Sequence, residues 1–346
     1  MRWSLLLCCL LLVGSISSAL SEPERRSFVI DRCQLVPLPG HQVSFRIDGV
    51  EKTRWHYGRE YPRPFFFPFN GPSGVSLTHM GHPGAGDHDH HRSIWFAFHK
   101  LGESALNFWG DGEGTQIRQK QWFAYKDGEE EAIMATALGY FDPDDREVMV
   151  QETVVAIRPM ADRRWGLEFQ LTLKPPSDEE EVVLGKTNFG ILAVRVAKSI
   201  SEHFGGGQLT NSMGERGESR IFGKPSWWMD YSGPVVAGSG PSRSVRTEGI
   251  TYYDHPDNPR YPSKWHVRAD GWMGASLCMD ANMIVSAERP MVLRYLLVAH
   301  AQSYNEGATR MEAEAFAKRP PFQIGKRGTP HEQWEVWRSE AKGGEQ

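Results

Sequence analysis

Alternation of apolar and polar residues constrains the fold of this chain more than any other feature. From Trp165 to Lys174, every second residue is large and apolar. Alternation with period 2 over this length is typical of a β-strand with one buried face. Gln42 to Asp48 shows the same pattern, and shorter versions occur at residues 147–157, 182–184, 191–196 and 291–298. We therefore expect a chain made mainly of strands.

Turn-forming residues separate these segments at 72–74, 126–128, 142–145 and 175–178. Only residues 305–318 favour a helix, with Asn305 as its N-cap and with Met311, Ala315 and Phe316 facing inward. No internal repeat and no linker divides the sequence. We therefore predict an all-β fold, a large β-sandwich formed by a single domain over residues 22–340.

The N-terminal segment has the order of a secretory signal peptide. Arg2 precedes an apolar run from Leu5 to Val13, and small residues follow up to Ala19. The run is shorter than the roughly 20 residues that span a bilayer, and no later segment approaches that length. We predict that residues 1–21 are a signal peptide and that the protein is exported, to the periplasm or the extracellular space, with no membrane span.

Charge and cysteine content narrow the range of partners. The formal net charge of -4 is spread along the chain, whereas a nucleic-acid surface needs a basic patch. After removal of the signal segment only Cys33 and Cys278 remain, so one disulfide could form. The 12 tryptophans offer aromatic surfaces that suit sugars. We expect a carbohydrate or another small molecule as the ligand, and no nucleic acid.

Histidines are concentrated between residues 79 and 99, which hold six of the 13 in the chain. Three interpretations fit this density. His88 and His90, with neighbouring aspartates, could bind a divalent metal ion such as Zn²⁺. Imidazoles could instead transfer protons without a metal, because they titrate near neutral pH. The third interpretation is that they only hold a loop rich in glycine and proline.

The residues that follow these histidines are typical of a strand that enters the core. If the strand begins near His91, then His91 and Trp95 share one face and Arg92 lies on the other. His90 and His91 would point to opposite sides, so one would serve a site and the other would hold the loop. We predict His91 as the proton-transfer residue, with His90 as the alternative.

Further candidate catalytic residues lie far along the chain. Asp230 and Tyr231 follow Trp228 in WWMDYSG, where they could act as base and proton donor beside a stacking tryptophan. The same residues could equally belong to a structural turn. His300 ends an apolar run, and it could complete a site with His91 at the rim of a sandwich; the alternative is a histidine that is only hydrogen-bonded at the surface.

Candidate substrate-binding residues include Arg195, which lies in an apolar strand where a buried charge needs a partner. It could bind a substrate carboxylate bidentately or form an internal salt bridge. The loop from His255 to Arg268 is expected to form a pocket wall. The full set of predicted binding residues is Arg92, Arg195, His266, Arg268, Trp109, Trp228 and Asn258.

Several motifs together resemble the secreted bacterial PmoA-like domain family. DHDHHRSIWFAF (residues 87–98) and NFWG (residues 107–110) are similar to the family pattern D-H-x-H-H-R-G followed by a Trp-rich strand and F-W-G. Residues 190–197, 227–233, 255–268 and 292–300 also match, so the resemblance covers nearly all of the mature chain. The family is of unknown function, and its methane-oxygenase name is a mislabel, since a membrane oxygenase would need transmembrane helices.

The resemblance implies a β-sandwich of the galactose-mutarotase type. It also implies a role with carbohydrates, since relatives occur in bacteria rich in polysaccharide-degrading enzymes. Ser93 stands where the family usually has Gly, which questions the close backbone approach expected there.

These observations lead to two main functional hypotheses, beside a third, a structural protein of the cell envelope, which would give no reason for the clustered histidines. The first is an exported carbohydrate-active enzyme, of hydrolase, lyase or epimerase type, in which His91 or His90 moves a proton and His300 or Asp230 is its counterpart. Arg92, Arg195 and His266 would neutralise or orient the sugar. The second is a non-catalytic module that binds a glycan or a metal ion. The enzyme hypothesis requires the candidate side chains to converge: His88, His90, His91, Arg195, His266 and His300.

Overall fold

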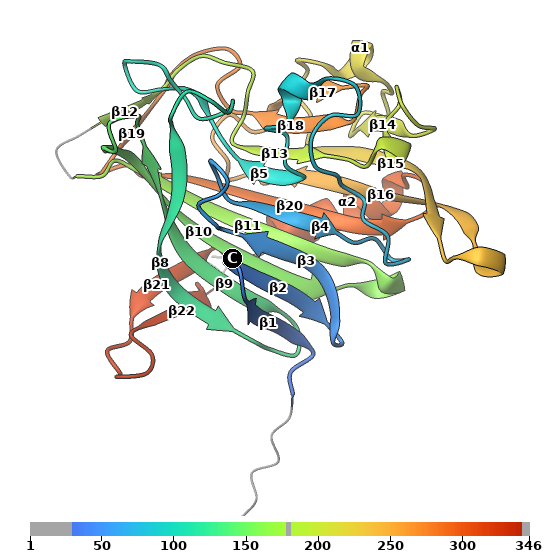
Figure 1. The fold of residues 1–346 in the computed structure, drawn as a ribbon, viewed down its shortest axis with the longest axis horizontal. Helices are drawn as coiled ribbons and strands as arrows, with labels where there is room; N and C mark the ends of the chain where they lie inside the picture. The colour runs from blue at the N-terminus through green and yellow to red at the C-terminus, as the bar shows by residue number, and fades with distance from the viewer. Residues whose placement is uncertain (1–29, 178–180, 341–346) are drawn as a thin grey trace, which may run out of the picture. The chain divides into compact units, whose positions relative to one another are not determined.

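A computed structural model describes residues 30–177 and 181–340 (Figure 1). The predicted signal peptide, residues 1–21, and the lower boundary of the predicted domain lie outside the described residues. From Asp31 onward the chain forms one compact unit. No helix in the described part of the chain is long and apolar enough to cross a membrane.

Two antiparallel sheets of eight strands form the body of this unit, as the sequence patterns predicted (Figure 1). The first sheet has the spatial order β1 (Cys33–Leu38), β2 (Gln42–Ile47), β3 (Val50–His56), β4 (Phe65–Phe69), β5 (Ile94–Phe96), β13 (Leu192–Arg195), β18 (Trp272–Ser276) and β17 (Lys264–Arg268). The second has the order β14 (Gln208–Asn211), β15 (Trp228–Ala237), β16 (Ser244–Asp254), β20 (Met291–Ala301), β11 (Trp165–Lys174), β10 (Glu147–Pro159), β9 (Ala132–Phe141) and β8 (Gln116–Lys126).

Two smaller sheets complete the described fold. One has the order β19 (Met283–Ser286), β12 (Glu181–Leu184), β6 (His99–Leu101) and β7 (Leu106–Asn107), and the other pairs β21 (Phe322–Lys326) with β22 (Trp334–Arg338). Strands therefore dominate the described residues, and the prediction of an all-β fold is confirmed.

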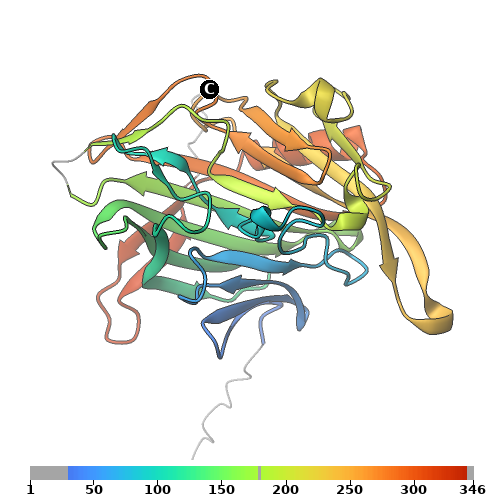
Figure 2. The ribbon, with the colours of Figure 1, turned by 45° about the horizontal axis from the view of Figure 1, so that its top comes forward.

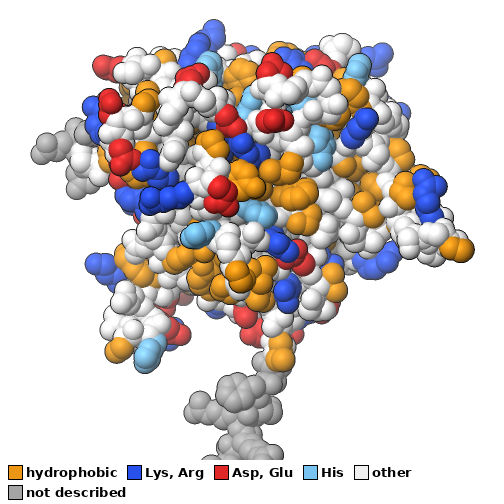
Figure 3. All heavy atoms as spheres, viewed as in Figure 1, with side chains coloured by type: hydrophobic (Ala, Val, Ile, Leu, Met, Phe, Trp, Pro, Cys, Tyr) orange, Lys and Arg blue, Asp and Glu red, His pale blue; other side chains and the backbone are white. Residues whose placement is uncertain are grey.

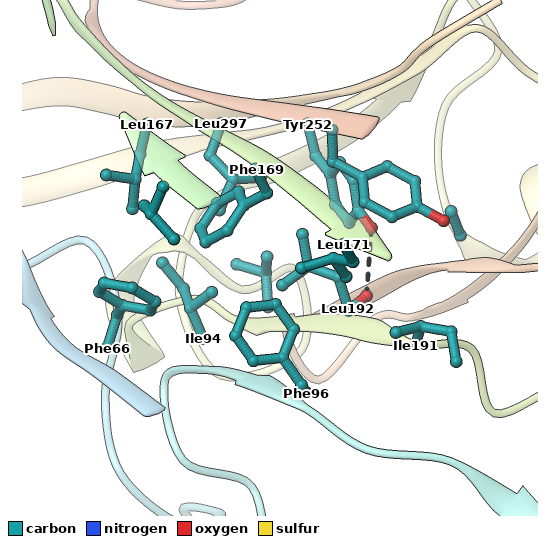
Figure 4. Packing of buried hydrophobic residues seen from close by; sticks show 14 of the residues in the cluster. Phe66, Ile94, Phe96, Leu167, Phe169, Leu171, Ile191, Leu192, Tyr252 and Leu297 are labelled. Carbon is teal, nitrogen blue, oxygen red and sulfur yellow. Dashed lines mark hydrogen bonds between the residues drawn. The ribbon is translucent and has the colours of Figure 1, made fainter. Parts of the chain in front are cut away.

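The main core lies between the two large sheets and follows from the alternation in β11. Phe169 on β11 meets Phe66 of β4 and Phe96 of β5, with ring centroids 5.6 and 5.8 Å apart (Figure 4). All three rings are 0–1% exposed. Burial of such a side chain contributes about 1.5–3 kcal/mol to folding. The period-2 pattern of the sequence therefore fixes which face of each sheet is internal.

Helix α2 (Glu306–Ala317) covers part of the outer face of the second sheet. Asn305 caps it as predicted, since its side chain accepts a hydrogen bond from the backbone N–H of Ala308. The prediction of its buried face was wrong in part, because Met311 is 73% exposed and Ala315 is also exposed. The helix packs through Phe316 and Thr309, which lie two turns apart on one face.

Strands β5, β13, β18 and β17 form one end of the first sheet (Figure 2). On its outer face this end of the sheet carries a second apolar layer. On β5, Ile94 and Phe96 enter the main core, whereas Trp95 points to this outer layer. The layer consists of Phe65, Trp95, Ala97, Trp109, Ala193 and Trp272. It forms an aromatic floor on which a site can be built.

Cys33 and Cys278 are both free and buried, so the disulfide that the sequence allowed does not form. Burial raises the pKa of Cys33 to about 11 and that of Cys278 to about 12. Both thiols therefore remain protonated near neutral pH, as buried structural cysteines do.

Candidate functional site

A cavity of about 350 Å³ lies above the aromatic floor of the first sheet. We call it the histidine pocket. On the face in Figure 3, several histidine side chains reach the surface beside hydrophobic and charged ones. The pocket is lined by the loop histidines His88, His90 and His91, by His99, Asn107, Trp109, Gly110 and Phe189, and by Arg195, His266, Arg268, Asp270 and Trp272.

His90 and His91 both line this pocket, so the prediction that they point to opposite sides was wrong. Their ring centroids are 4.4 Å apart. The prediction assumed that the strand begins near His91, but β5 begins only at Ile94. The two residues belong instead to the loop that follows the short 3₁₀ helix η1 (Gly86–His88), where strand alternation does not apply.

A bend at Ser93 separates this loop from β5. Ser93 has a φ of +56°, a conformation that glycine adopts more readily than other residues. Its hydroxyl lies 2.7 Å from the Thr78 hydroxyl, a hydrogen bond that glycine could not form. The positive φ thus explains why the resembled family pattern has glycine at this position. The hydrogen bond to Thr78 offsets part of the conformational free energy that serine costs there.

His91 lies flat over the aromatic floor, on the same side as Trp95, as predicted. Its ring centroid is 5.3 Å from that of Trp95 at 24° and 6.4 Å from that of Trp272 at 11°. Burial, followed by the charges of His90 and Arg195, lowers the pKa of His91 far below its usual range. His91 is therefore a neutral imidazole at physiological pH.

His266 is a second neutral imidazole against the same floor. Its ring centroid lies 3.8 Å from that of Trp272. Burial, and then the charge of Arg268, lower the pKa of His266 to about 3. Its Nδ1 lies 3.1 Å from the backbone carbonyl of Asn188, which can only accept a hydrogen bond. The proton is therefore on Nδ1, and Nε2 carries a free lone pair.

Arg195 is fully buried and forms an ion pair with Asp270 at the base of the pocket. Its Nη1 donates to Asp270 Oδ1 over 2.8 Å. The other carboxylate oxygen lies 2.9 Å from His82 Nε2, while His82 Nδ1 accepts the N–H of Gly84. His82 therefore donates through Nε2, and both oxygens of Asp270 are engaged.

The pocket concentrates buried nitrogen atoms that have no hydrogen-bond partner. Of the eleven buried side-chain N and O atoms without a partner in the described residues, six belong to residues that line the pocket. They are His91 Nδ1, Trp109 Nε1, Arg195 Nε, Arg195 Nη2, His266 Nε2 and Trp272 Nε1. An unpaired buried polar group costs about 1–3 kcal/mol, so such a concentration indicates a site for a polar ligand.

His300 and Asp230 do not belong to this pocket, and the prediction that His300 would complete a site with His91 was wrong. His300 lines a separate cavity beside α2. There its Nε2 lies 2.8 Å from Oδ2 of buried Asp230, and Thr251 donates to the same oxygen. On β20, Leu297 and Ala299 enter the main core, so His300 points to the outer face of the second sheet.

Tyr231 and Trp228 also lie outside the histidine pocket. Tyr231 is adjacent to Asp230 in β15 and so points to the opposite face, where its hydroxyl donates to the carbonyl of Ala269 over 2.9 Å. Trp228 is buried between the second sheet and α2, and its Nε1 faces the hydroxyl of Tyr304. These positions in one long strand exclude the interpretation of WWMDYSG as a turn.

Two of the predicted binding residues support loops. Arg92 is paired with Asp111, at 2.5 Å between Nη2 and Oδ2, and it does not line the pocket. Asn258 is buried and bonds the backbone of Arg294 and the carboxylate of Asp254. The structure therefore brings His88, His90, His91, Trp109, Arg195, His266 and Arg268 together and leaves His300, Asp230, Tyr231, Trp228, Arg92 and Asn258 elsewhere.

The residues present do not fit a metal centre. Within residues 30–177 and 181–340, no three His, Cys, Asp or Glu side chains are arranged so that they could hold a metal ion. His88 bonds Asp87 instead, over 2.8 Å, at an exposed position.

Sequence reasoning missed Asp270, Trp272, Phe189 and His99. Asp270 and Trp272 flank Gly271 in the tight connection between β17 and β18. An Asp-Gly pair between two strand-like segments is a signal for a hairpin, and it could have placed Trp272 opposite Arg268. In the structure Trp272 pairs with both Arg268 and Arg195 across neighbouring strands.

Comparison with known proteins adds a family and a distant structural likeness. The model of a family of unknown function, DUF6807, matches residues 42–315, and it does not carry the PmoA-like label. No curated protein matches the sequence. Among solved structures, the GalM/aldose epimerase homologue from C. elegans is similar with a TM-score of 0.32 and 8% identity, covering 79% of this chain and 99% of that chain. A similarity this weak does not assign an activity.

Proposed function

This chain belongs to DUF6807, a family of unknown function, and we propose that its histidine pocket binds a small carbohydrate and catalyses the transfer of a proton to or from that carbohydrate. The observation that carries the proposal is the set of unpartnered buried nitrogens around one cavity of about 350 Å³. A cavity of this kind, apolar with a few convergent polar groups, is typical of a small-molecule site. We also propose that the enzyme acts outside the cytoplasm, after export.

His266 is suited to accept the proton. The Asn188 carbonyl holds its ring proton on Nδ1, so the free lone pair of Nε2 is available. A fixed tautomer removes the need for reorientation during the reaction. Binding of a ligand with negative charge would raise the pKa of His266 from about 3 and make the imidazole a stronger base.

His91 is the second proton-transfer residue in this proposal. Its ring centroid lies 6.4 Å from that of Trp272, to which His266 is also close at 3.8 Å, and its Nδ1 is buried without a partner. The two imidazoles can therefore act on the same ligand, one as base and one as acid after protonation. Trp109 and Trp272 present aromatic faces and free N–H groups, which suit the apolar face and the hydroxyl edge of a sugar.

Elimination or epimerisation fits the pocket better than hydrolysis. Glycoside hydrolysis in most enzymes uses a pair of carboxyl groups. Among the described residues that line this pocket the only carboxylate is Asp270, and both of its oxygens are engaged by Arg195 and His82. The other titratable groups of the pocket include imidazoles, which can remove a proton from a carbon atom and return it.

The test is product formation from a panel of mono- and oligosaccharides, followed by chromatography, with binding measured by calorimetry. Wild-type protein should convert at least one sugar that it binds. His91→Ala and His266→Gln should each lower kcat by ~10²–10⁴-fold, the usual contribution of a general acid or base. His331→Ala removes an exposed histidine outside the pocket and should retain full activity.

Each outcome has a distinct meaning. Full activity of both pocket variants would refute the assignment of His91 and His266 as proton-transfer residues. Binding without conversion, across the panel, would support a non-catalytic glycan-binding module. No binding of any sugar would overturn the proposal as a whole.

A further inference from the structure

The hydrogen-bonding capacity of the histidine pocket is strongly biased toward donors. Arg195, Trp109 and Trp272 supply four unpartnered buried donor nitrogens. Indole and guanidinium nitrogens donate and do not accept. The ligand atoms that meet these groups must therefore be acceptors.

The side-chain oxygens at the pocket already accept hydrogen bonds from the protein. Asp270 uses both oxygens for Arg195 and His82. The side-chain oxygen of Asn107 accepts the backbone N–H groups of Trp109 and Gly110, at 2.9 and 3.2 Å. Apart from imidazole nitrogens, the lining side chains offer few free acceptors for hydrogen bonds from the hydroxyl groups of a sugar. A neutral sugar has as many donors as hydroxyl groups, so it matches this pocket poorly.

The free atoms of Arg195 form one edge of the guanidinium group. Asp270 takes Nη1, whereas Nε and Nη2 remain buried and unpartnered. Nε and Nη2 are parallel donors on the same side of the planar group, the fork that binds a carboxylate with two hydrogen bonds. Asp270 fixes the orientation of this fork from the opposite side, and His82 fixes Asp270.

From this arrangement we infer that the ligand of the histidine pocket is an acidic sugar, whose carboxylate is bound side-on by Nε and Nη2 of Arg195. The inference rests on the proposed function and names its substrate class. Arg195 is 0% exposed, so the two charge-assisted hydrogen bonds would form away from water, where they are strong.

A carboxylate in this position also suits the chemistry of His266. Removal of the proton from the carbon next to the carboxylate breaks a C–H bond and forms an N–H bond at Nε2. The electron pair spreads onto the carboxylate oxygens, which Arg195 binds. Return of a proton from protonated His91 to the other face gives the epimer. In an elimination the electron pair instead forms a double bond to the next carbon, whose substituent leaves with its bonding electrons and takes up that proton, which gives an unsaturated sugar acid.

The test compares matched acidic and neutral sugars on wild-type protein by calorimetry. D-glucuronate and D-galacturonate, with their short oligomers, should bind at least about 10-fold more tightly than D-glucose and D-galactose and their oligomers. Equal or tighter binding of the neutral sugars would overturn the inference and leave the proposed function standing. Failure of all these sugars to bind would overturn both.

Two variants assign the effect to Arg195. Arg195→Lys retains the charge but loses the fork, so affinity for the uronates should fall by about 10- to 100-fold while affinity for neutral sugars is unchanged. Arg294→Lys makes the same change at an equally buried arginine, paired with Glu168 outside the pocket, and should leave uronate affinity unchanged. Thermal unfolding of both variants checks that they are folded. Unchanged uronate affinity in folded Arg195→Lys would overturn the assignment.

Discussion

Replacement of Asp270 by asparagine tests the ion pair that orients Arg195. Arg195 is fully buried, whereas the Asp270 side chain is 31% exposed. Loss of one partner from a fully buried pair costs about 3–5 kcal/mol, and partial exposure of the carboxylate reduces this to about 1–2 kcal/mol. The amide introduced by Asp270→Asn would also direct an N–H group toward either Arg195 or His82, and His82 cannot switch tautomer without losing its bond to Gly84. That lost bond adds about 1 kcal/mol.

We therefore expect Asp270→Asn to lower the free energy of unfolding by about 2–3 kcal/mol at pH 7, measured by urea denaturation. Burial alone would raise the pKa of Asp270, but Arg195 and His82 outweigh it, so the pKa in the folded state is lowered. A lowered pKa stabilises the fold above the pKa of the unfolded state, about 3.9, and this contribution is lost as pH falls through the folded-state pKa. The difference in the free energy of unfolding between wild type and Asp270→Asn should therefore persist at pH 5 and narrow below about pH 4.

Asp48→Asn is the matched control, because Asp48 pairs with Arg32 at the surface with 58% of its side chain exposed. It should cost less than about 1 kcal/mol. If Asp270→Asn costs no more than Asp48→Asn at pH 7, Asp270 does not hold Arg195 and the reasoning about the free guanidinium edge fails.

Three further predictions concern stability and reactivity. Burial alone would lower the pKa of His300, but Asp230 outweighs burial and raises that pKa in the folded state. The pair's contribution to stability is therefore complete below about pH 6.5 and is lost as pH rises through the folded-state pKa. Urea denaturation of wild type at a series of pH values should show this fall in the free energy of unfolding, and the same fall in Asp230→Asn would refute the coupling. Phe169→Ala should lower the free energy of unfolding by about 3–5 kcal/mol, and a loss under about 1 kcal/mol would contradict the packing between the sheets. Cys33 and Cys278 should react with a thiol reagent only after unfolding in urea, and rapid labelling of the native protein would contradict their burial.

The strands could be predicted where the information is local. The bounds of β11 agree with the alternation from Trp165 to Lys174, because the period of one strand depends only on its own residues. The cap at Asn305 is also local. Met311 was misplaced because the buried face of α2 is set by the sheet on which it packs.

The membership of the histidine pocket could be predicted only in part, because it depends on pairing between distant strands. Arg195 joins the pocket since β13 pairs with β5 and β18, which carry Trp95 and Trp272. His300 has a similar sequence setting, but β20 pairs with β11 and β16 in the other sheet. The bend at Ser93 was hidden in this chain's own residues, since serine does not indicate a positive φ, and the glycine of the resembled family pattern was its signal.

Proton transfer on a bound sugar is the property on which the proposed role of the histidine pocket depends. It can be observed by NMR of uronates and neutral sugars incubated with the protein in D₂O. We predict that wild-type protein exchanges or removes the hydrogen on the carbon next to the carboxylate and that His266→Gln does so ~10²–10⁴-fold more slowly. A bound sugar that keeps all its carbon-bound hydrogens in the presence of wild-type protein would contradict this role.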